Sequence, residues 1–195
     1  MNEPTKASQP TRVQKLWKIF LLTAFPIHVW NLLMVFKDME FVTERSEMWG
    51  AIGYAGYSLL YAFLESIIIA ILIWIISLLI PRKWDQTRAF TALISVYFVL
   101  AGASAVEQAA YAFEQYRIAK QFIYGLENFT TLTYGLIIGA IFLAIAGLLL
   151  LIYKTKNGGK ALAEFYDRLI LLSYLYLVLD AAGIVIVIIR NIPSA

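Results

Sequence analysis

The chain has 195 residues, of which 61% are hydrophobic and only 15% charged, and its mean hydropathy is +0.73. A soluble domain of this size needs a larger polar surface, so the composition predicts a membrane protein instead. Because the chain has no cysteine and one histidine, thiolate and multi-histidine metal sites within one chain are excluded. The net charge of +3 does not indicate nucleic-acid binding, because the basic residues flank apolar segments.

Residues 1–16 are predicted to form a polar cytoplasmic tail, and residues 17–195 a single transmembrane domain. The first apolar span covers residues 17–36. We interpret it as a retained helix and not a cleaved signal peptide, because it is long and no small-residue cleavage site follows it. Pro26 lacks a backbone donor, so it is expected to kink this helix and free the carbonyl of Leu22.

The second span covers residues 52–80 and contains Glu65. At ~1.5 Å per residue, Glu65 would lie about 24 Å from Pro81, near the outer side of a ~30 Å hydrocarbon core. Tyr54, Tyr57 and Tyr61 precede Glu65 at helical spacing and should share its face. The pattern predicts an aromatic belt at the outer boundary, with Glu65 just below it and reachable by water.

The third span covers residues 89–110, and Glu107 would lie about 28 Å from Arg88 along it. The short connection between Pro81 and Arg88 predicts that the second and third spans are antiparallel neighbours. Glu65 and Glu107 would then form an outer carboxylate pair that shares a proton or binds a cation. The alternative is that the third helix simply leaves the membrane at Glu107. Residues 111–129, rich in aromatic residues, are expected to continue this helix or lie on the membrane surface.

The fourth span covers residues 130–153 and carries the motif Gly135-Leu-Ile-Ile-Gly139. A GxxxG pair lets helix backbones approach closely. The motif therefore predicts tight helix packing, either within one chain or between two copies of it.

The fifth span covers residues 169–189 and places Asp180 about 18 Å from Arg168, near the bilayer midplane. An aspartate at that depth costs roughly 2.5–3.5 kcal/mol, so it should face the bundle interior with a polar partner. On the first span His28 and Asn31 have similar estimated depths, about 15 and 20 Å. Together with Tyr176, one turn before Asp180, they define a candidate polar site in mid-bilayer. The alternative is that these groups only hold helices together through hydrogen bonds.

The fold class is therefore predicted as all-α: a polytopic integral membrane protein with a bundle of five transmembrane helices. The positive-inside rule puts the N-terminus in the cytoplasm and the C-terminus outside the cell membrane. Of the 16 Lys and Arg residues, 11 would lie on the cytoplasmic side: Lys6, Arg12, Lys15, Lys18, Arg82, Lys83, Arg88, Lys154, Lys156, Lys160 and Arg168. The acidic segment 37–48 would form an outer loop.

The sequence contains none of the motifs HExxH, GxSxG or GxxxxGK[ST], and it points to no particular cofactor or metal. The chain is expected to be a non-enzymatic transporter-like protein or an accessory or assembly subunit. The alternative is an intramembrane enzyme that acts on a lipid or a lipid-linked carrier through Asp180 and Glu65 or Glu107. The expected partners are the lipid bilayer and a membrane protein or a second copy of the chain, with no nucleic acid.

Overall fold

The computed structural model describes residues 12–81, 85–112, 130–154 and 158–192. These residues form five α-helices: α1 (Arg12–Arg45), α2 (Met48–Leu78), α3 (Gln86–Ala112), α5 (Thr130–Lys154) and α6 (Gly158–Asn191). Each helix is long and apolar enough to cross a membrane, and no strand occurs in the described residues. The predicted all-α fold with five helices is confirmed.

Most helices extend beyond the apolar spans that predicted them, although α2 ends at Leu78, before the predicted residue 80. α1 begins at Arg12 and continues to Arg45, so the expected outer loop is reduced to Ser46 and Glu47. Its last turn is closed by the Ser46 hydroxyl, which donates to the Val42 carbonyl at 2.7 Å. α6 likewise begins at Gly158, well before the predicted 169. Hydropathy reports which residues can face lipid, whereas backbone hydrogen bonds continue a helix into water, so the two boundaries differ.

Two expected segments lie outside the described residues. They are residues 1–11 of the predicted tail and residues 113–129 of the aromatic connection. The remaining tail residues, 12–16, belong to α1.

At the start of α3 the Asp85 carboxylate accepts hydrogen bonds from the backbone N–H groups of Thr87 and Arg88, so Asp85 caps that helix.

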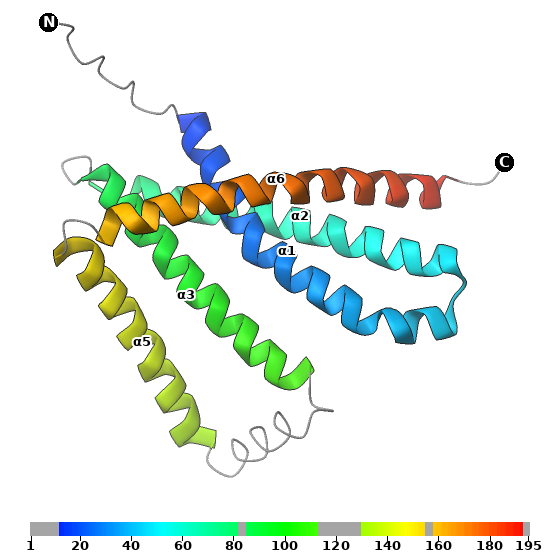
Figure 1. Ribbon diagram of the computed structural model, residues 1–195, viewed down its shortest axis with the longest axis horizontal. Coiled ribbons are helices and arrows are strands. Elements are labelled where there is room, and N and C mark those ends of the chain that lie inside the picture. Colours follow the sequence, from blue (N-terminus) through cyan, green and yellow to red (C-terminus); the bar gives the residue numbers. More distant parts are fainter. Residues whose placement is uncertain (1–11, 82–84, 113–129, 155–157, 193–195) are drawn as a thin grey trace, which may run out of the picture.

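The five helices form two groups that separate at one end (Figure 1). α1 and α2 make the most extensive antiparallel contact, and α6 packs across both. α3 packs mainly on α5, and its contact with α2 is the smallest among the packed pairs. The short connection from α2 to α3 therefore does not make them close neighbours along their length, because α3 diverges from α2 (Figure 1).

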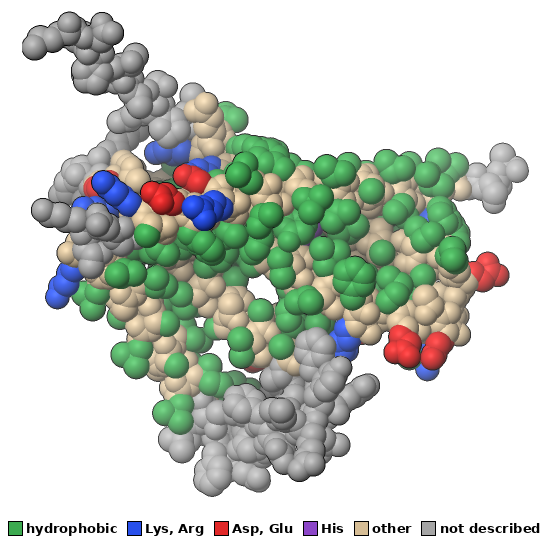
Figure 2. All heavy atoms as spheres, viewed as in Figure 1, with side chains coloured by type: hydrophobic (Ala, Val, Ile, Leu, Met, Phe, Trp, Pro, Cys, Tyr) green, Lys and Arg blue, Asp and Glu red, His purple; other side chains and the backbone are tan. Residues whose placement is uncertain are grey.

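The buried core lies where α1, α2, α3 and α6 meet. It consists of Ile19, Phe20, Leu21, Leu22, Ala70, Ile73, Ile94, Tyr166 and Leu169. On the face shown in Figure 2, charged side chains gather near the start of α6 and near the α1–α2 turn, and hydrophobic side chains cover the middle. Many large apolar side chains of the described residues are exposed, as in helices that meet lipid and not water.

Glycine brings α2 and α6 together, but not through the motif that the sequence emphasised. A Cβ on Gly183 would lie 2.9 Å from the Leu59 Cβ and 3.1 Å from the Gly56 carbonyl oxygen. These separations leave no room for a side chain on Gly183. In contrast, a Cβ on Gly135 or Gly139 would meet nothing within 4 Å. Within the described residues the GxxxG motif of α5 therefore packs no helix of this chain, and packing between copies stays a prediction.

Candidate functional site

The structure joins α1 and α6 through one buried polar contact. The His28 Nε2 atom lies 2.8 Å from the Asp180 Oδ1 atom, and both residues are almost completely buried. The other ring nitrogen of His28, Nδ1, lies 2.8 Å from the Ala24 carbonyl oxygen one turn earlier. The sequence predicted His28 or Asn31 as the partner of Asp180, and the structure shows that it is His28.

These two contacts determine how many protons the pair holds. A carbonyl oxygen only accepts hydrogen bonds, so the Nδ1 atom of His28 must carry a proton and donate it to Ala24. The Nε2–Oδ1 contact then requires one further proton, either on the imidazole or on the carboxyl group. In both cases the pair is neutral overall. This neutrality explains how an aspartate is accommodated inside a membrane-spanning bundle.

Tyr176 and Asn31 complete the predicted polar site in different ways. The Tyr176 ring stacks on the His28 ring with a centroid distance of 5.1 Å and an interplanar angle of 13°. Asn31 lies one turn beyond His28 on α1, and its Nδ2 atom is buried without a hydrogen-bond partner among the described residues. The Asp180 Oδ2 atom is also buried without a hydrogen-bond partner among the described residues. Each of these two atoms can still bond to a water molecule or a small polar ligand.

Two further contacts join the helices around the site. At one end of α1 the Lys18 ammonium pairs with Asp167 of α6 at 2.7 Å, which anchors the two helices to each other. Beside Pro26, the Tyr97 hydroxyl of α3 donates to the Thr23 carbonyl at 3.0 Å. The sequence predicted a freed carbonyl near Pro26 but not that Tyr97 would bind in this turn. Only the crossing of α1 and α3 brings these residues together.

Glu65 and Glu107 do not form the expected carboxylate pair. Both side chains are exposed, and no hydrogen bond or ion pair joins them in the described part of the chain. The Thr23 hydroxyl donates to the Ser66 carbonyl at 3.3 Å, so Glu65 lies beside the level of Thr23. Tyr54 lies about 16 Å from Glu65 along α2, close to the turn that joins α1 and α2, and its hydroxyl donates to the Asp38 carboxylate. Glu65 thus lies near the middle of α2, and its expected position just below an outer tyrosine belt stays a prediction.

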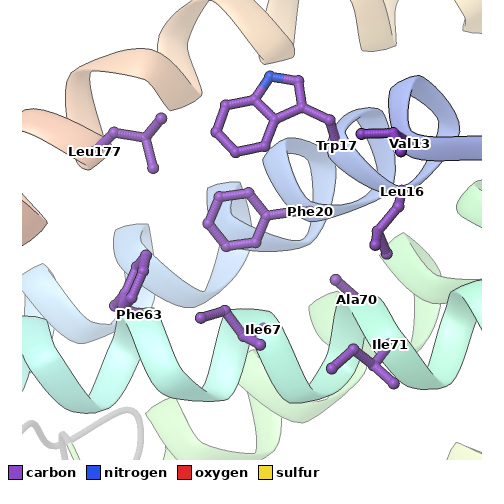
Figure 3. Close-up of a pocket in the computed structure, with 9 residues that line it drawn as sticks. All are labelled: Val13, Leu16, Trp17, Phe20, Phe63, Ile67, Ala70, Ile71 and Leu177. Carbon is purple, nitrogen blue, oxygen red and sulfur yellow. The ribbon is translucent and has the colours of Figure 1, made fainter.

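An apolar pocket of about 390 Å³ lies between α1, α2 and α6, separate from the polar pair (Figure 3). It is lined by Val13, Leu16, Trp17, Phe20, Phe63, Ile67, Ala70, Ile71 and Leu177. The rings of Trp17 and Phe20 and the side chain of Leu177 lie around its centre (Figure 3). No titratable side chain lines this pocket, so it can accept a hydrocarbon chain but offers no group for acid–base chemistry.

Comparison with known proteins adds no functional information. No protein-family model, curated protein or solved structure matches the chain. Among the described residues, no group of three or more His, Asp or Glu side chains could hold a metal ion. The chemistry of the His28–Asp180 pair is therefore the basis for any functional assignment.

Proposed function

We propose that this chain is a non-enzymatic, multi-pass membrane protein of transporter-like type whose His28–Asp180 pair binds and releases a proton. The observation that carries this proposal is the pair itself: two titratable groups on different helices, buried and joined at 2.8 Å, that together hold one transferable proton. Buried ionisable groups of this kind are typical of proton relays and ion pathways in membrane proteins.

Loss of that proton would change the charge of the site and favour a different arrangement of α1 and α6. Without it, a neutral imidazole lone pair would face a carboxylate across 2.8 Å, and the site would carry one uncompensated negative charge. In a medium of low dielectric constant this state is unfavourable unless α1 and α6 separate or a donor or cation reaches Asp180. The unused Oδ2 atom of Asp180 would accept from that donor or coordinate that cation.

The single histidine allows a direct test. In protein labelled with ¹⁵N-histidine and placed in lipid nanodiscs, every imidazole resonance comes from His28 once any affinity tag is removed. We expect the Nε2 resonance to change when the pair gains or loses its proton, and this change to disappear in Asp180→Asn. A resonance that stays the same at every pH at which the protein remains folded would contradict proton binding and release.

Mass spectrometry of protein purified with its native lipids tests the proposal that the chain is transporter-like. A small molecule that is bound to wild type and lost in Asp180→Asn supports it. A stoichiometric protein partner that remains in Asp180→Asn, with no small molecule, would instead identify an assembly subunit held together by the pair.

For orientation we propose a cytoplasmic N-terminus and an outer C-terminus, because Arg12, Lys15 and Lys18 begin α1 whereas Arg190 is the only basic residue in the last turn of α6.

A further inference from the structure

α2 carries an exposed stripe that has the spacing of a helix-packing surface. This stripe, which we call the α2 seam, recurs at intervals of four and three residues and is exposed throughout. It consists of Tyr61, Glu65, Ile68, Leu72 and Ile75 of α2 and of Leu79, the C-cap residue of that helix. This 3.5-residue period is the one with which two helices pack along each other at a small left-handed angle. From Tyr61 to Leu79 the seam is about 27 Å long, close to the thickness of a hydrocarbon core.

Glu65 distinguishes this seam from an ordinary lipid-facing surface. Apolar residues surround it along the seam, and it lies at the level of Thr23, away from both polar ends of the bundle. Tyr97 of α3 is close enough to Glu65 to interact electrostatically, but Glu65 makes no hydrogen bond or ion pair in the described part of the chain. A carboxylate at such a position ordinarily has a partner, because neither lipid nor an apolar side chain can compensate its charge.

We propose that the α2 seam binds a transmembrane helix of another protein, and that this helix carries a Lys or Arg opposite Glu65. Charge complementarity decides between a different protein and a second copy of this chain. A symmetric dimer through the seam would place Glu65 against Glu65, two like charges at the same depth. In α2 no Lys or Arg occurs that a second copy could present at this level. This inference concerns a different face from the His28–Asp180 site and does not depend on its function.

A pair of designed helices tests the proposal without knowledge of the natural partner. The probes are poly-leucine transmembrane peptides of roughly 20 residues, one with a central Lys and one with Leu at that position. The protein carries a donor dye on Ser8→Cys, its only cysteine, in phosphatidylcholine vesicles, and each peptide carries an acceptor. We expect the Lys peptide to bind wild type about tenfold more tightly than the Leu peptide.

Three variants make the result specific. Glu65→Gln should abolish the preference for the Lys peptide, and Glu65→Lys should transfer the preference to a peptide with a central Glu. Glu107→Gln removes another exposed carboxylate, on α3, and should leave the preference unchanged. Equal binding of the two peptides to wild type, or a preference that persists in Glu65→Gln, would overturn the proposal. Energy transfer between labelled copies of this chain that falls in Glu65→Gln would also overturn it, because the seam would then be a homodimer surface.

Discussion

The replacement of Asp180 by Asn or by Leu separates the two roles of its carboxyl group. In Asp180→Asn the amide can donate to the Nε2 atom of a neutral His28, so the bond between α1 and α6 is kept while the transferable proton is lost. We expect the free energy of unfolding to fall by less than about 0.6 kcal/mol, the mean value of a hydrogen bond between membrane helices. In Asp180→Leu the Nε2 atom of the buried His28 loses its partner, and we expect a loss of about 1–3 kcal/mol.

Reversible unfolding in mixed micelles with increasing dodecyl sulfate measures both values, and a double-mutant cycle with His28→Leu checks the reasoning. In the double variant both polar partners are gone, so its loss should be smaller than the sum of the two single losses. The reasoning is refuted if Asp180→Asn loses as much stability as Asp180→Leu. It is also refuted if the two Leu substitutions are additive within about 0.5 kcal/mol.

Three other predictions follow from particular contacts and from the proposed orientation. Gly183→Val should lower the free energy of unfolding by about 1–3 kcal/mol because Leu59 occupies the required space, and Gly139→Val, which faces open space, should change it little in the same assay. Tyr97→Phe removes the hydroxyl that binds the Thr23 carbonyl and should cost about 0.6 kcal/mol in that assay. An impermeant thiol reagent on intact cells should label Ser194→Cys but not Ser8→Cys; the opposite result would reverse the orientation, and labelling of both or neither would contradict an odd number of spans.

Hydropathy by itself determined the number of helices and their order, because immersion in lipid requires about 20 apolar residues and little else. The sequence also predicted that Asp180 pairs with His28 or Asn31, since a carboxyl group in mid-bilayer is energetically costly and few polar partners exist at that depth. Hydropathy did not predict the residues at which the helices begin and end. The polar segments after Phe36 and before Leu169 are helical because backbone hydrogen bonds form equally well outside lipid.

Only the tertiary structure decided which helices touch and at which register. The position of Glu65 beside Thr23, the divergence of α3 from α2, and the use of Gly183 in place of Gly139 all depend on how side chains of different helices fit together. Every helix here is apolar around most of its surface, so hydropathy does not distinguish a face that meets lipid from one that meets another helix. Shape and close contact make that distinction, and they exist only once the helices are assembled.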